Sequence, residues 1–82
     1  MAERILWRVL QGSSDANIRF SDLRALLLRL GFEERIKGSH HIFTREDIGE
    51  ILNLQPRKAL AKPYQVKQVR KILVRYKLAE EA

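Results

Sequence analysis

The chain has 82 residues, a length that fits one small domain with a modest core and not two. A hydrophobic content of 45% with 32% charged residues is that of a folded chain, and the lack of cysteine excludes a disulfide framework and a thiolate zinc site. The formal net charge of +6, from 16 basic and 10 acidic residues, favours a polyanionic partner.

Neither export nor membrane insertion is expected from the sequence. The N-terminus, Met1-Ala2-Glu3-Arg4, lacks the basic segment and the apolar run of a signal peptide. No apolar stretch approaches the roughly 18 residues that a membrane-spanning helix needs. We therefore expect a cytoplasmic protein with no membrane association.

The N-terminal residues 2–11 show the spacing of a short helix. Their apolar residues form two i,i+4 pairs, Ile5 with Val9 and Leu6 with Leu10. Trp7 lies off this stripe. We expect it to pack into the core, and a surface for a partner is the alternative. Residues 12–17 have the composition of a loop.

A second helix is predicted over residues 21–30. Ser21 is a suitable N-cap, and Asp22 places a negative charge where the helix dipole favours one. Gly31 stands where a left-handed residue commonly ends a helix. The apolar positions form a stripe that faces a core: Leu23, Leu26, Leu27 and Leu30.

Three strands are predicted next. The first covers residues 32–37 and is joined to the second, residues 40–45, by a Gly38-Ser39 turn, because glycine tolerates the positive φ of a tight hairpin. Residues 45–49 read as a solvated loop. A third strand follows over residues 50–55 and ends at a proline.

The C-terminal part combines a basic connector, residues 57–63, with a last helix over residues 64–77. The apolar stripe of this helix comprises Val66, Val69, Ile72, Leu73 and Tyr76. Its other side carries a cationic ridge of Lys67, Lys71 and Arg75. Such a ridge attracts polyanions, and a solubilising surface is the alternative explanation.

The order of elements predicts the fold class. Three strands with short links form an antiparallel meander, and the apolar stripes of the helices need one face of that sheet to cover. We expect an α+β domain with helices on one face of a three-stranded sheet and an open face on the other.

The two histidines of the chain, His40 and His41, follow the Gly38-Ser39 turn directly. Successive strand residues point to opposite faces, so the two imidazoles cannot face one substrate together. His41 shares the parity of Phe43, which we expect to face the helices. His40 is therefore expected on the open face.

Cations flank these histidines and suggest chemistry on a phosphodiester. Arg35 and Lys37 precede the turn on the neighbouring strand. An unperturbed imidazole titrates near pH ~6.5, which suits a general acid or base. There are three alternatives: surface histidines without a catalytic role, a two-histidine metal site, and Ser39 as a nucleophile. The metal site is disfavoured because the two rings diverge. The nucleophile is disfavoured because a serine in a turn commonly caps its own loop.

Several segments in this order resemble the HicA toxin family, also called YcfA-like. They are Leu30-Gly31-Phe32, Lys37-Gly38-Ser39-His40-His41-Ile42-Phe43 and the basic helix from Tyr64 to Leu78. The resemblance covers a core of about residues 20–78 in a single domain, 1–82. Residues 1–19 form a helix and loop beyond what a minimal member needs.

The resemblance implies a fold similar to double-stranded-RNA-binding domains. It implies a ribosome-independent mRNA endonuclease, neutralised by a HicB-like antitoxin, whose catalytic histidine lies in the Gly-Ser-His-His segment. The sequence departs from the family at Asn53-Leu54-Gln55-Pro56, where many members have a basic Pro-Arg-His-like strand end.

We therefore expect a histidine to take a proton from a ribose 2′-OH, with no metal or cofactor and with RNA preferred over DNA. The candidate catalytic residues are His40 and His41. The candidate RNA-binding residues are Arg35, Lys37, Gly38, Ser39, Lys58, Lys62, Lys67 and Lys71. The alternatives are an RNA-binding module of the same fold without catalysis and a domain that binds only proteins.

Overall fold

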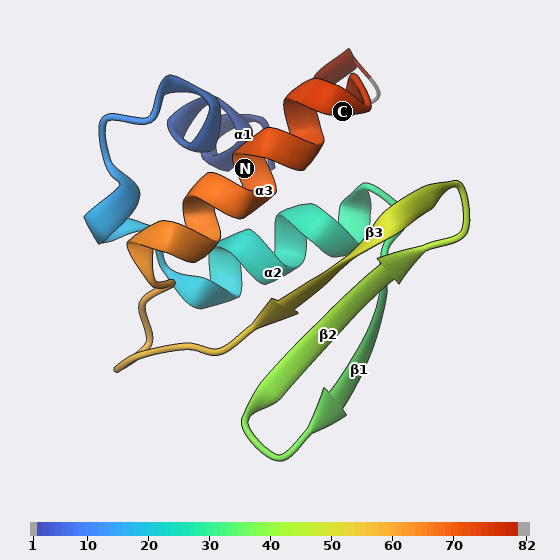
Figure 1. Cartoon of the computed structure of the whole chain (residues 1–82). Helices are drawn as coiled ribbons and strands as arrows, with labels where there is room; N and C mark the ends of the chain where they lie inside the picture. The colour runs from blue at the N-terminus through green and yellow to red at the C-terminus, as the bar shows by residue number, and fades with distance from the viewer. Residues whose placement is uncertain (1, 81–82) are drawn as a thin grey trace.

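Helices form one layer of the molecule and an antiparallel sheet forms the other (Figure 1). This computed structural model describes residues 2–80, with side chains from Arg4 onward. The elements are α1 (Ala2–Gln11), a 3-10 turn (Asp15–Asn17), α2 (Phe20–Arg29), β1 (Glu33–Lys37), β2 (His40–Arg45), β3 (Ile48–Leu54), α3 (Pro63–Arg75) and a second 3-10 turn (Leu78–Glu80). Within the described residues no helix has the length and apolar character to cross a membrane.

The sheet has the order β1-β2-β3, so the strand with both histidines is central. Gly38 has a φ of +62° and makes the tight turn between β1 and β2 possible. The register pairs Glu34 with Phe43 and Phe43 with Leu52, and this set faces the helices. Arg35, Ile42 and Asn53 form the neighbouring set on the open face.

The core lies between the sheet and the helical layer. The predicted leucine stripe of α2 is buried, as are the apolar residues of α1 and α3 that face it. From the sheet, Phe43, Leu52 and Leu54 are almost completely removed from water. The predicted α+β class, with helices on one face, is confirmed and agrees with a double-stranded-RNA-binding-domain-like fold.

The start of α2 differs from the prediction, because the helix begins at Phe20 and Arg19 occupies the N-cap without a side-chain hydrogen bond. Ser21 is therefore not the cap. The Phe20 side chain is buried, and its backbone N–H donates to the carbonyl of Ala59 at 2.9 Å. Tertiary contacts thus fix the first turn where the sequence offered a local cap. Gly31, with a φ of +89°, follows the helix as expected.

Other boundaries also shift. The connection between β2 and β3 shrinks to Glu46 and Asp47, and β3 begins at Ile48, whose side chain is buried. Helix α3 ends at Arg75, and Lys77 adopts a φ of +55°. The expectation that Trp7 packs into the core was wrong: its side chain is 62% exposed on α1.

A partly buried ion pair ties α3 to the N-terminal segment. Arg70 donates to both carboxylate oxygens of Asp15 at 3.0 Å and to the carbonyl of Val9 at 2.9 Å. The hydrogen bonds from Arg70 hold the pKa of Asp15 below its ordinary value of 3.8, against the opposing effect of burial. The N-terminal helix and the 3-10 turn that follows it are thereby fastened to α3.

We expect Asp15→Asn to lower the free energy of unfolding by about 1 kcal/mol at pH 7, because it removes the charge that Arg70 binds. A carboxyl group whose pKa is lower in the folded state stabilises the fold at pH values above its pKa in the unfolded state. This stabilisation is lost as the pH falls through the pKa of the folded state. Urea unfolding at pH 7 and pH 3 should show the difference shrinking at pH 3. Glu46→Gln, at an exposed turn, is the control, and an equal loss at both pH values would contradict the linkage.

Candidate active site

The two adjacent histidines point to opposite faces of the sheet. His41 lies on the side of the helices, where its ring meets that of Phe20 edge to face at a centroid distance of 4.7 Å. His40 is exposed on the other face, where it contacts Asn53. The strand alternation read from the sequence therefore places the rings as expected.

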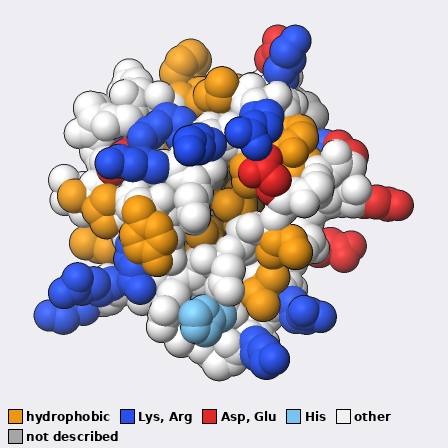
Figure 2. Space-filling view, viewed as in Figure 1, with side chains coloured by type: hydrophobic (Ala, Val, Ile, Leu, Met, Phe, Trp, Pro, Cys, Tyr) orange, Lys and Arg blue, Asp and Glu red, His pale blue; other side chains and the backbone are white. Residues whose placement is uncertain are grey.

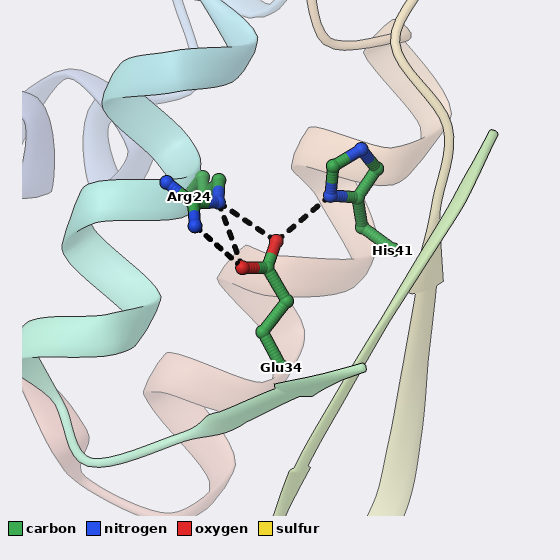
Figure 3. A network of polar contacts seen from close by, with 3 residues as sticks. All are labelled: Arg24, Glu34 and His41. Atoms are coloured by element: carbon green, nitrogen blue, oxygen red, sulfur yellow. Dashed lines mark hydrogen bonds and ion pairs between the residues drawn. The ribbon is translucent and has the colours of Figure 1, made fainter. Parts of the chain in front are cut away.

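His41 belongs to a network that joins three elements (Figure 3). Its Nδ1 donates to Glu34 Oε2 at 2.8 Å, and the Glu34 carboxylate also accepts from Arg24 of α2, at 2.7 Å from Nη2 to Oε1. The Arg24 hydrogen bonds are the largest cause of a lowered pKa at Glu34, with a smaller contribution from His41.

This network has the features of a structural anchor. The side chains of Glu34 and His41 are only 7% and 18% exposed, respectively. Each partner comes from a different element, namely β1, β2 and α2. The network therefore fixes the β1–β2 hairpin against the helix and leaves little of the His41 ring open to a substrate.

His40 is held differently. Its Nδ1 lies 3.0 Å from Asn53 Oδ1, an oxygen that can only accept a hydrogen bond. The contact therefore requires the proton on Nδ1, which leaves the lone pair of Nε2 available in the neutral ring. An exposed imidazole in this tautomer can accept a proton from a bound hydroxyl.

A second amide secures the turn that precedes His40. Gln55 Nε2 donates to Ser39 Oγ at 2.8 Å. The amide of Gln65, oriented so that both of its atoms are satisfied, in turn bonds the backbone N–H and carbonyl of Gln55 at 2.9 and 3.1 Å. Because Gln65 is 1% exposed, the first turn of α3 supports the histidine turn through the end of β3.

Cations accompany His40 on the open face. Lys37 is its register partner on β1, and Arg35 lies on the same face two residues earlier. Neither has an acidic partner among residues 2–80, so both charges remain available to an anion. Figure 2 shows an exposed histidine side chain with lysine or arginine side chains to either side of it.

The remaining predicted RNA-binding residues are not gathered at this face. Gly38 and Ser39 form the turn itself. Lys58 and Lys62 lie in the connection between β3 and α3, whereas Lys67 and Lys71 lie on α3, in the helical layer on the other side of the sheet (Figure 1). Lys67 is close enough to Asp15, and Lys71 to Glu50, to help lower the pKa of that carboxyl.

The sequence reading missed the polar residues that hold the histidines, namely Asn53, Gln55, Glu34 and Arg24. The sequence pattern could have indicated two of them, Asn53 and Gln55. Asn53 and Gln55 alternate with leucines on β3, so a meander with a two-residue turn brings them beside His40 and Ser39. The Arg24 contact depends on how α2 crosses the sheet, which periodicity does not define.

Comparison with known proteins decides the family. The family model described as HicA toxin of bacterial toxin-antitoxin matches residues 20–75, more than half of the chain. The chain belongs to the HicA toxin family. Searches of curated proteins and of solved structures found no significant match.

Membership of the HicA family makes this chain the toxin of a toxin-antitoxin system, with an antitoxin as its partner. HicA toxins are generally of the RNase type. The matched region begins at Phe20, after α1, and contains the Gly-Ser-His-His turn with both histidines. Among residues 2–80, no three histidine or acidic side chains gather as metal ligands do.

The different environments of His40 and His41 predict different rates of chemical modification. His40 is exposed and His41 is partly covered by Phe20 and Glu34, so diethyl pyrocarbonate should modify His40 several times faster. Peptide mass spectrometry over a time course measures both sites in one sample. Glu34→Gln, which weakens the anchor, should speed modification of His41 and leave His40 unchanged. Faster modification of His41 in the unaltered protein would contradict the described arrangement.

Proposed function

We propose that this HicA toxin is a metal-independent endoribonuclease that cleaves mRNA, with His40 as the catalytic base. The observation that carries the proposal is the exposed His40 ring, whose Nδ1 is engaged by Asn53 and whose Nε2 is open, on a face that also presents Lys37 and Arg35. The same observation favours His40 over His41 as the reacting histidine.

The reaction follows from that geometry. Nε2 of His40 takes the proton of a ribose 2′-OH, and the oxygen attacks the adjacent phosphorus. The P–O5′ bond breaks, the 5′ oxygen takes a proton from water, and the other product ends in a 2′,3′-cyclic phosphate. Lys37 and Arg35 stabilise the negative charge that grows on the phosphoryl oxygens. DNA lacks the attacking hydroxyl, which accounts for selectivity toward RNA.

Other predicted residues would hold the RNA on either side of the cleaved bond. The Gly38-Ser39 backbone is close enough to His40 to approach the same phosphate. Lys58 and Lys62 extend the positive surface along the connection that follows β3, and Lys67 and Lys71 attract the polyanion from a distance. We further propose a cytoplasmic single-domain toxin, 1–82, whose partner is a HicB-like antitoxin.

Cleavage of RNA by histidine variants tests the role of His40. His40→Ala should lower the cleavage rate by about 10²–10⁴-fold, the usual contribution of a general base, and EDTA should not affect the unaltered protein. His41→Ala should keep most of the rate per folded molecule and unfold at lower urea concentration. Full activity of His40→Ala, or intact RNA that is merely bound by the unaltered protein, would exclude the proposed mechanism.

The Asn53 contact gives a second test. Asn53→Ala removes an acceptor that sets the tautomer, so the rate should fall about tenfold, the equivalent of one hydrogen bond. Asn53→Asp restores the acceptor and favours the protonated imidazole, so the acidic limb of the pH–rate profile should move to higher pH. Unchanged pH–rate profiles in both variants would show that Asn53 does not orient His40.

A further inference from the structure

A pocket of about 470 Å³ lies between the end of β3 and the beginning of α3, outside the His40 site. Four of its lining residues are apolar: Ala16, Leu60, Ala61 and Pro63. The other four lining residues, which we call the rim, are Arg57, Lys58, Lys62 and Tyr64. Pockets of this size accept small ligands of the dimensions of a nucleotide.

The chemistry of the rim selects the kind of ligand. No acidic side chain lines the pocket, and its three cations have no ion-pair partner within residues 2–80. The Tyr64 ring is 57% exposed, although an aromatic side chain ordinarily gains by burial. Figure 2 shows basic side chains gathered over the β3–α3 connection of Figure 1. Cations beside an exposed aromatic ring and apolar side chains suit a phosphate joined to a base.

The backbone that carries these residues is strained at two positions and is held by hydrogen bonds. Lys58 and Ala59 have φ values of +50° and +68°, in the left-handed region that disfavours residues other than glycine. Two hydrogen bonds between Arg57 and Leu60, at 2.8 and 3.0 Å, close this turn. A bond from the Ala61 N–H to the carbonyl of Ile18, at 2.9 Å, fixes it to the body. The rim is thereby held in a set shape before any ligand arrives.

The pocket is also close to the His40 turn. Gln55 binds Ser39 through its side chain and Gln65 through its backbone. Arg57 follows Gln55 by two residues, which limits the separation of their Cα atoms to about 7 Å. A strand of RNA bound at His40 therefore reaches the pocket within a few nucleotides.

We infer that this pocket is a nucleotide subsite that binds an unpaired base of the RNA substrate on Tyr64 and the attached phosphates on Arg57, Lys58 and Lys62. The identity of the ligand as RNA rests on the proposed function; the pocket itself rests on its own geometry. The subsite makes single-stranded RNA the substrate, since a base in a duplex is stacked on its neighbours and cannot lie on Tyr64.

A binding experiment that needs no catalysis tests the subsite. The probe is a ten-residue single-stranded RNA with every 2′ position methylated, which blocks the proposed cleavage. Fluorescence anisotropy measures its affinity for the full chain, and amide chemical shifts locate the contact. Tyr64→Ala should weaken binding about fivefold or more, and Tyr64→Phe should bind as the unaltered protein does. Arg57→Ala should reduce the slope of log affinity against log salt by about 0.7.

Matched controls separate the pocket from general effects. Trp7→Ala removes another exposed aromatic ring, and Arg29→Ala removes another exposed cation, and neither residue lines the pocket. Both variants should bind as the unaltered protein does. Equal affinities for Tyr64→Ala and Trp7→Ala, or shifts that avoid residues 57–64, would overturn the subsite. Shifts there with polyglutamate and not with the oligonucleotide would overturn it in favour of an acidic protein segment.

Cleavage of unmodified RNA distinguishes the proposed catalytic role of His40 from the proposed subsite at Tyr64. If His40→Ala abolishes cleavage while Tyr64→Ala binds and cleaves normally, the subsite fails and the catalytic proposal stands. If the pocket variants lose binding while His40→Ala still cleaves, the catalytic proposal fails and the subsite stands.

Discussion

The alternation of side chains along β2 is the constraint on which the site depends. Two adjacent imidazoles on one strand must face opposite sides of a sheet, and only one side is covered by helices. His41 consequently meets Glu34 and Phe20, whereas His40 is left on the open face beside Lys37. The backbone thus gives two copies of one residue type two different environments.

The anchoring contacts make the open-face histidine a positioned group and not a loose surface side chain. On the face of the sheet that the helices cover, the Glu34 carboxylate is bound by both Arg24 and His41. The pKa of Glu34 is lowered and not raised, so these charge-assisted hydrogen bonds outweigh the cost of burying the carboxylate. At the far end of β3, Gln55 holds Ser39. Contacts from the helical face and from the end of β3 therefore restrict the motion of the turn that carries His40. Such restriction is what the proposed role as a base would require.

Sequence reasoning succeeded where a local rule was sufficient and failed where tertiary contacts overrode it. The leucine stripe of α2, the left-handed Gly31 and the hairpin at Gly38 follow from periodicity and backbone sterics, and the opposite orientations of the histidines follow from strand geometry. The Ser21 cap failed because burial of Phe20 sets the start of the helix. The strained turn at Lys58 carries no glycine, so no sequence pattern indicated the pocket beside it.

The chemical nature of the ends left by RNA cleavage tests the central claim most directly. If His40 activates the ribose 2′-OH, mass spectrometry of the products will show 2′,3′-cyclic phosphates and 5′-hydroxyls, and a substrate with a single 2′-deoxy nucleotide at the cleaved position will resist. Products with 5′-phosphates, or efficient cleavage of the 2′-deoxy substrate, would contradict an attack by the neighbouring hydroxyl and with it the assigned role of His40.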